Sequence, residues 1–182
     1  MILYIHGFGS SAFSIKAKLL KKYFGDTNIF IPSLPYIPNL AIDTLEQIIK
    51  IFPNIQIIGS SLGGYYANYL ANKYNLKAVL INPAMNPDVT LKKAVPLGIS
   101  YYDNSRHDFH QSYLDELRYF KVDKPNLKNI YLFVQGGDEV LNPNDSLNYF
   151  KGGNILFEKG GNHGFKNFET KLEIIQKFFN QV

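Results

Sequence analysis

Three polar residues of types that cooperate in acyl-transfer chemistry each lie in a glycine-rich turn after a short apolar run: Ser61, Asp138 and His163. Ser61 is the central residue of Gly59-Ser60-Ser61-Leu62-Gly63, a Gly-x-Ser-x-Gly pattern, and a helix-compatible run follows it. A sharp strand-to-helix turn of this kind, a nucleophile elbow, exposes the serine hydroxyl at the edge of a sheet. The pattern therefore predicts that Ser61 is a nucleophile.

A serine nucleophile needs partners, because its hydroxyl reacts poorly until a neutral imidazole takes its proton. His163 is the predicted base, and Asp138 is predicted to orient the imidazole and to stabilise it when it is charged. The chain order Ser…Asp…His is the order of an α/β-hydrolase triad. The backbone N–H groups of Leu62, after the nucleophile, and Phe8, in the turn after the first strand, are the predicted oxyanion donors.

Other titratable residues leave alternatives open for the acid and the base. Glu139 is adjacent to Asp138 and is an alternative acid. His6 follows the first apolar run, where a structural hydrogen bond is favoured over proton transfer. His107 and His110 lie away from any predicted strand end, and we expect them at the surface or at the rim of the substrate site.

The sequence contains no pattern typical of a metal or cofactor site. There is no cysteine, and no His-Glu-x-x-His run is present. The glycine-rich stretches complete neither a dinucleotide fingerprint nor a phosphate loop. We therefore expect no metal and no cofactor.

Short apolar runs predict the strands that would position these residues. They cover residues 1–5, 28–31, 55–58, 78–81, 130–134 and 155–157. Apolar residues at helical spacing between them predict helices over residues 14–24, 40–52, 62–74, 108–120, 144–150 and 165–179. The alternation predicts an α/β fold of about six mainly parallel strands with helices on both faces, whose carboxyl ends gather the functional groups.

The length of 182 residues predicts one domain, residues 1–182. Within it, residues 84–128 have a weak pattern, and a long irregular segment inside a compact domain is usually functional. We expect this segment to form a small cap-like insertion over the site. Tyr36 and Tyr102 are the aromatic residues predicted to contact substrate, and together with Phe8 and Leu62 they favour an acyl chain.

Composition narrows the class of partner. The net charge of +4 comes almost wholly from scattered lysines, with two arginines, which is not the clustered pattern of a nucleic-acid surface. No run of 18 apolar residues is present, and the amino terminus lacks the basic region of a signal peptide. We therefore expect neither a nucleic-acid partner, nor a membrane span, nor a leader segment.

Several stretches together resemble the YqiA-like esterases of the α/β-hydrolase superfamily. They are Tyr4-Ile5-His6-Gly7-Phe8 with Ser10-Ser11, residues 59–66, Ile81-Asn82-Pro83-Ala84, residues 137–141 and Gly160-Gly161-Asn162-His163-Gly164-Phe165. The resemblance implies a compact α/β-hydrolase fold with Ser61, Asp138 and His163 as its triad. It also implies carboxylic ester or acyl-thioester substrates and a bacterial cytoplasmic location.

These observations favour a serine esterase or thioesterase that forms an acyl-enzyme on Ser61 and acts on a small-molecule acyl ester or thioester. We expect a monomer or a small homo-oligomer. Two alternatives remain: a non-catalytic binding or regulatory protein with the same fold, and an acyltransferase that uses the same acyl-enzyme. Intact Ser, Asp and His at three separate strand ends argue against the first alternative.

Overall fold

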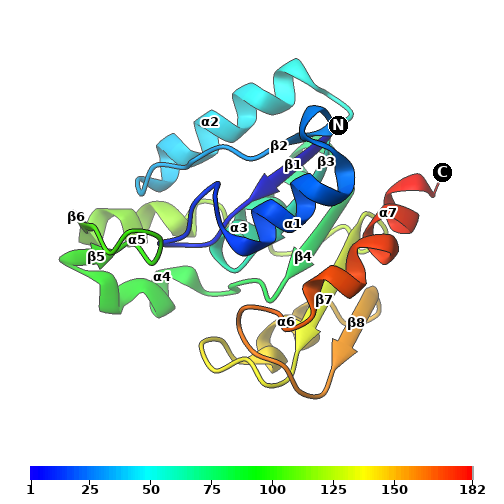
Figure 1. Cartoon of the computed structure of the whole chain (residues 1–182). Coiled ribbons are helices and arrows are strands. Elements are labelled where there is room, and N and C mark those ends of the chain that lie inside the picture. Colours follow the sequence, from blue (N-terminus) through cyan, green and yellow to red (C-terminus); the bar gives the residue numbers. More distant parts are fainter. Residues whose placement is uncertain (182) are drawn as a thin grey trace.

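The computed structural model describes residues 1–181, which contain a six-stranded parallel sheet with the order β2-β1-β3-β4-β7-β8 (Figure 1). The strands are β1 (Ile2–Ile5), β2 (Ile29–Phe30), β3 (Gln56–Ser60), β4 (Ala78–Ile81), β7 (Ile130–Gln135) and β8 (Asn154–Glu158). All six strands expected from the apolar runs are present, and the prediction of a parallel α/β fold is confirmed. The strands at the centre of the sheet are buried on both faces, which explains why they appear in the sequence as uninterrupted apolar runs.

Helices cover both faces of this sheet. On one face lie α1 (Ile15–Phe24) and α7 (Leu172–Asn180), which pack Leu20 and Ile175 against the strands. On the other face lie α2 (Pro38–Ile51), α3 (Leu62–Tyr74) and α5 (Gln111–Arg118), which supply Leu45, Leu70 and Leu114 to a second core cluster. The short helix α6 (Pro143–Tyr149) connects β7 to β8.

Two predicted helices begin later than their apolar patterns indicated. The helix expected over residues 165–179 is replaced by a 3-10 turn, η3 (Phe168–Lys171), followed by α7. Phe165 and Asn167 have φ angles of 60° and 59°, which are incompatible with a right-handed helix. The helix expected over residues 108–120 is present as α5 but begins only at Gln111, because Arg106–Asp108 form the strand β6.

The irregular segment of residues 84–128 contains short elements. They are α4 (Pro87–Thr90), a 3-10 turn η2 (Leu91–Ala94), the antiparallel pair β5 (Leu97–Ile99) and β6 (Arg106–Asp108), and α5. This segment lies beside the sheet on the side toward which β1 points, green in Figure 1. It is attached to the turn after β1, since the Tyr101 backbone N–H donates to the Gly9 carbonyl at 2.6 Å.

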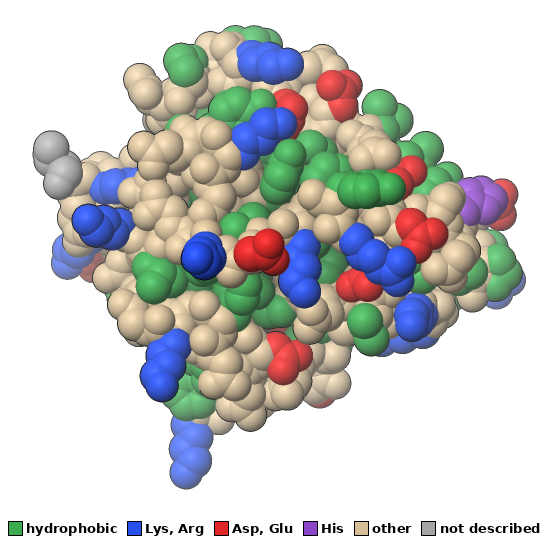
Figure 2. Space-filling view, turned by 180° about the vertical axis from the view of Figure 1, so that it is seen from behind, with side chains coloured by type: hydrophobic (Ala, Val, Ile, Leu, Met, Phe, Trp, Pro, Cys, Tyr) green, Lys and Arg blue, Asp and Glu red, His purple; other side chains and the backbone are tan. Residues whose placement is uncertain are grey.

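The surface is mixed in character. On the face in Figure 2, basic side chains are dispersed among acidic and apolar ones instead of forming a single patch. Within residues 1–181, no helix has both the length and the apolar character that crossing a membrane requires.

Candidate active site

Ser61 occupies the turn between β3 and α3 and has φ 57° and ψ −121°, a conformation that non-glycine residues rarely adopt. Two glycines make room for this turn. A Cβ on Gly63 would lie 2.0 Å from the Ile5 carbonyl oxygen, and a Cβ on Gly59 would lie 2.3 Å from the Gly63 oxygen. The Gly-x-Ser-x-Gly pattern therefore reflects the close approach of α3 to β3 and β1.

The side chains of Ser61, His163 and Asp138 form one hydrogen-bonded chain. His163 Nε2 lies 3.0 Å from Ser61 Oγ, and His163 Nδ1 lies 2.8 Å from Asp138 Oδ2. A neutral imidazole in this position donates its Nδ1–H to the carboxylate, which leaves Nε2 free to accept the serine proton. The fold thus brings together three residues that the sequence singled out at three separate strand ends.

The Asp138 carboxylate is held in its ionised form. Its side chain is 3% exposed, and Oδ1 accepts hydrogen bonds from the backbone N–H groups of Val140 and Leu141, each at 2.9 Å. Burial opposes ionisation, but the hydrogen bonds from His163 and from these two amides outweigh it and lower the pKa of Asp138. A negative charge therefore faces the imidazole from the side opposite Ser61.

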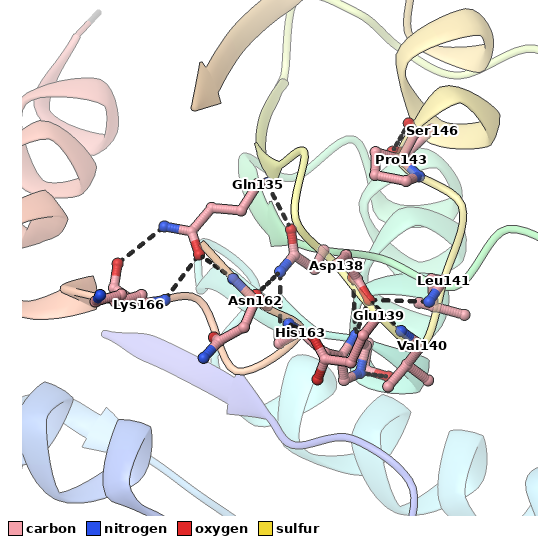
Figure 3. Close-up of polar contacts among 12 residues, drawn as sticks. Gln135, Asp138, Glu139, Val140, Leu141, Pro143, Ser146, Asn162, His163 and Lys166 are labelled. Atoms are coloured by element: carbon pink, nitrogen blue, oxygen red, sulfur yellow. Dashed lines mark hydrogen bonds and ion pairs between the residues drawn. The ribbon is translucent and has the colours of Figure 1, made fainter. Parts of the chain in front are cut away.

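Glu139, the alternative acid, contacts His163 at a different place. Its Oε2 accepts the His163 backbone N–H at 3.0 Å, and the ring nitrogen is hydrogen bonded to Asp138 (Figure 3). Glu139 is thus placed to position the histidine backbone, whereas Asp138 is placed to orient its ring.

None of the other three histidines contacts the Ser61 hydroxyl: His110 is exposed and packs on Tyr113, and both ring nitrogens of His107 are buried without a hydrogen-bond partner among residues 1–181. His6 Nδ1 lies 3.0 Å from the Gly7 oxygen, and His6 Nε2 accepts the Leu34 N–H at 3.3 Å, so both nitrogens are engaged with backbone. The His107 ring is stacked on Tyr36, with ring centroids 3.3 Å apart. Burial lowers the pKa of both His6 and His107.

Two buried amide side chains fix the loop that carries His163 (Figure 3). Asn82 Nδ2 donates to the carbonyl oxygens of Asn162 and His163 at 3.0 and 3.1 Å, and its Oδ1 accepts the Gln135 N–H at 2.9 Å. Gln135 Oε1 accepts the N–H groups of Asn162 and Lys166 at 3.0 and 2.8 Å. Asn82 is 3% exposed and Gln135 is 2% exposed.

Asn82 stood out in the sequence only as a polar residue at a strand end and within a stretch that carries the family resemblance, and Gln135 was not singled out. Each lies at the carboxyl end of a buried apolar strand, Asn82 directly after β4 and Gln135 as the last residue of β7. A primary amide at such a position is the signal that points to a structural role, because a buried amide requires several hydrogen-bond partners.

The two predicted oxyanion donors flank the nucleophile. Leu62 is the first residue of α3. Phe8 lies in the turn after β1, directly after Gly7. This turn is close to the nucleophile, since a Cβ built on Gly7 would lie 3.1 Å from Ser61 Cβ. Among residues 1–181, neither the Leu62 nor the Phe8 backbone N–H has a hydrogen-bond acceptor. Both backbone N–H groups are thus free to donate a hydrogen bond to a ligand oxygen beside Ser61.

A cavity of about 630 Å³ opens at Ser61 and His163. Apolar side chains that line it are Phe8, Ile15, Leu19, Leu62, Ala84, Pro87, Leu91, Val140, Leu141, Phe165 and Phe168. Polar and aromatic residues that line it include Tyr4, Ser14, Lys16, Ser60, Thr90, Lys93, Tyr101 and Glu169. Part of the wall comes from residues 84–128, at Ala84, Pro87, Thr90, Leu91, Lys93 and Tyr101.

The tyrosines predicted to contact substrate, Tyr36 and Tyr102, do not line this cavity. The Tyr36 ring is covered by His107, and Tyr102 is 57% exposed and stacks on Phe13 with centroids 5.9 Å apart. The cavity therefore does not support a substrate-contact role for these two residues, whereas Tyr101 is one of its lining residues. Tyr101 is the first residue of a turn over residues 101–103 and is itself largely exposed.

Residues 1–181 contain no group of three or more His, Cys, Asp or Glu side chains arranged to hold a metal ion.

Solved structures with this fold include several hydrolases. Est1E from Butyrivibrio proteoclasticus, in a structure with bound ferulic acid, has a TM-score of 0.69 at 12% identity, over 98% of this chain and 85% of that one. Mouse alpha/beta hydrolase domain-containing protein 10 has a TM-score of 0.71 at 16% identity, over 97% and 87% of the two chains. A monoacylglycerol lipase from Paleococcus ferrophilus has a TM-score of 0.67 at 14% identity, over 98% and 93%. These similarities show the α/β-hydrolase fold.

Relatives in sequence include UPF0227 proteins of Vibrio and Shewanella species. One from Vibrio parahaemolyticus is 24% identical over 188 residues, which cover 99% of both chains. One from Vibrio cholerae is 30% identical over 112 residues, which cover 58% of this chain and 63% of the relative. Residues 1–180 match the family described as "Uncharacterised protein family (UPF0227)", and the chain therefore belongs to this family.

Proposed function

We propose that this protein is a serine hydrolase that cleaves carboxylic esters or acyl thioesters through an acyl-enzyme on Ser61. The observation that carries the proposal is the hydrogen-bonded chain from Ser61 Oγ through the His163 ring to the ionised Asp138 carboxylate. The fold, which is shared with esterases and other hydrolases, is consistent with this chemistry.

In the proposed acylation step, His163 Nε2 takes the proton of Ser61 Oγ as the oxygen attacks the substrate carbonyl carbon. The carbonyl oxygen becomes an oxyanion, which accepts hydrogen bonds from the Leu62 and Phe8 N–H groups. The tetrahedral intermediate then collapses, and the C–O or C–S bond breaks as the leaving group takes the proton from His163.

In the deacylation step, a water molecule replaces the alcohol or thiol. His163 takes a proton from the water as its oxygen attacks the acyl carbon, and then returns a proton to Ser61 Oγ as the carboxylic acid leaves. Asp138 remains ionised throughout, since its role is to stabilise the imidazolium and to fix its orientation.

The cavity supports an acyl substrate with an apolar portion. Leu62, Leu91 and Leu141 belong to its predominantly apolar lining. We propose that residues 84–128 act as a cap, because six of them contribute to the cavity wall. The cap would then select substrates by the shape of the acyl group.

A fluorophosphonate probe tests the proposal, since such probes form a covalent bond with activated serines. Native wild-type protein should be labelled, Ser61→Ala should not, and the matched control Ser33→Ala, which changes an exposed serine, should be labelled like wild type. Ser61→Ala should also lower ester hydrolysis by at least about 1,000-fold. Absence of labelling in the folded wild type, or equal labelling of Ser61→Ala, would contradict the proposal.

A further inference from the structure

Four polar side chains lie together along one part of the cavity wall, on the face of the sheet that α1 covers: Tyr4, Ser14, Lys16 and Ser60. Tyr4 belongs to the core cluster of that face. Ser60 points to the same face because it is two residues beyond Ile58, which is in the same cluster, and side chains alternate along a strand. We call this group the α1-side cluster. One of its members, Ser60, directly precedes Ser61 in the chain.

Lys16 is the charged member of the cluster, and nothing in the described chain neutralises it. Its side chain is half-buried, lines the cavity and has no ion pair within residues 1–181. Burial lowers the pKa of Lys16 to about 8, which leaves the ammonium mostly charged near neutral pH.

Helix stability does not explain the position of this lysine. Lys16 is in the first turn of α1, which contains no acidic residue. The helix dipole places a partial positive charge at this end, where a cation is unfavourable and an anion is favourable. A lysine that is half-buried, unpaired and close to a helix amino terminus therefore suggests a ligand that carries negative charge.

The other three members of the cluster supply neutral hydrogen-bond donors. Tyr4 is 2% exposed and Ser60 is 5% exposed. Burial raises the pKa of Tyr4, so the phenol keeps its proton, and the Ser14 and Ser60 hydroxyls lie beside it. Ser14 Oγ accepts the Ala17 N–H at 3.3 Å and retains its own O–H for donation. A carboxylate, which only accepts hydrogen bonds, suits such a set.

On the basis of the hydrolase function proposed above, we propose that the α1-side cluster binds a carboxylate group of the ester substrate, with Lys16 as its counter-ion. The carboxylate belongs either to the acyl part or to the alcohol part of the ester. Two other charged residues line the cavity. Lys93 carries the same positive charge as Lys16. Glu169 is the one acidic residue in the cavity lining among residues 1–181; it is exposed and forms no ion pair with Lys16.

Two pairs of esters distinguish the sources of the carboxylate. For the acyl side, the p-nitrophenyl monoester of glutaric acid is compared with the p-nitrophenyl ester of glutaramic acid, in which a neutral amide replaces the carboxylate. For the alcohol side, 4-carboxyphenyl butyrate is compared with 4-carbamoylphenyl butyrate. kcat and KM are measured for wild type, Lys16→Met, Lys16→Arg and Lys18→Met, the last being an exposed lysine on α1 outside the cavity lining.

We expect Lys16→Met to lower kcat/KM by about 10-fold or more for the acid of one pair, mainly through KM, because a charged hydrogen bond is lost. Its amide partner should change by less than about two-fold. Lys16→Arg should retain most of the preference for the acid, and Lys18→Met should resemble wild type. Equal effects of Lys16→Met on acid and amide in both pairs would overturn the inference. Failure of the wild type to hydrolyse any of the four esters would count against the hydrolase function itself.

Discussion

At the scale of single residues, Asn82 links three parts of the molecule through one buried side chain. It connects the end of β4, where it lies, to the last residue of β7 and to the loop that carries His163. Because the two carbonyl groups that it binds belong to Asn162 and His163, its amide fixes the backbone from which the imidazole extends. Asn82 is therefore a positioning residue for the proposed base.

Replacement of Asn82 by alanine should lower both activity and stability. The change leaves the Gln135 N–H and two carbonyl groups without their partners in a buried site, which costs about 1–3 kcal/mol for each group that stays unsatisfied. We expect kcat to fall by about 10- to 100-fold as His163 loses its fixed distance from Ser61. Ester hydrolysis and urea denaturation measure the two effects.

The matched control is Asn148→Ala, which removes an exposed amide from α6 and should change neither quantity appreciably. Loss of stability in Asn82→Ala with unchanged kcat in the fraction that remains folded would show that the amide supports the fold and does not position His163.

The residues of the proposed triad could be predicted from the sequence because each of them follows an apolar strand in a glycine-rich turn. Such turns are formed by residues adjacent in sequence, so the sequence alone reveals them. The order Ser61, Asp138, His163 is also the chain order of α/β-hydrolase triads. The partners of Asn82 and Gln135 could not be predicted in this way. An amide side chain can bond to many backbone groups, and only the packed sheet determines which of them it meets.

At the scale of elements, the site depends on how closely α3 packs against the sheet. A Cβ on Gly63 would lie 2.0 Å from the Ile5 oxygen and 2.6 Å from the His6 oxygen, both of which are backbone atoms that cannot rotate away. The first turn of α3 therefore touches the end of β1. This contact places the Leu62 N–H next to the turn that contains Phe8.

Gly63→Ala should force α3 away from β1. We expect a loss of about 3 kcal/mol or more in the free energy of unfolding, at or above the upper end for overpacked sites, together with loss of ester hydrolysis. Gly160→Ala is the matched control, since a Cβ there meets nothing within 4 Å. Thermal and urea denaturation give the comparison, and equal stability of the two variants would contradict the close packing of α3 on β1.

The strands and most helices could be predicted because burial imposes a strict pattern on them. The last helix was misjudged at its start: Phe165 and Phe168 are buried like the later apolar residues of α7, although Phe165 has a positive φ and cannot be helical. Apolar periodicity reports burial, and burial alone does not distinguish a helix from a packed loop. The short strands β5 and β6 were missed because three residues are too few to show alternation.

At the scale of the whole molecule, the buried His6 and the half-buried His107, whose ring nitrogens are buried, couple folding to pH. Burial lowers the pKa of His6 and of His107 below the ordinary value of 6.5. Between that value and the lowered one, the unfolded chain binds protons that the folded protein excludes, so the free energy of unfolding falls as the pH falls. The lowered pKa of Asp138 has an effect of the same sign, but only at pH values near and below its ordinary value of 3.8.

Stability should therefore be lower at pH 5.5 than at pH 7.5, and His107→Phe should reduce the difference. Phenylalanine retains a flat ring that can stack on Tyr36 but has no proton to bind. Urea denaturation of both proteins at the two pH values provides the measurement. An identical loss of stability in wild type and in His107→Phe would mean that His107 is protonated without cost in the folded protein.

The separation of 102 residues between Ser61 and His163 has a consequence for the chain while it is being made. A ribosome adds about 5–20 residues per second, so about 5–20 seconds pass between the synthesis of the serine and that of the histidine. During that interval Ser61 lacks the base that the proposed mechanism assigns to it. In the proposed mechanism a nascent chain therefore cannot form the acyl-enzyme, and ester hydrolysis would report that the carboxyl-terminal segment has joined the sheet.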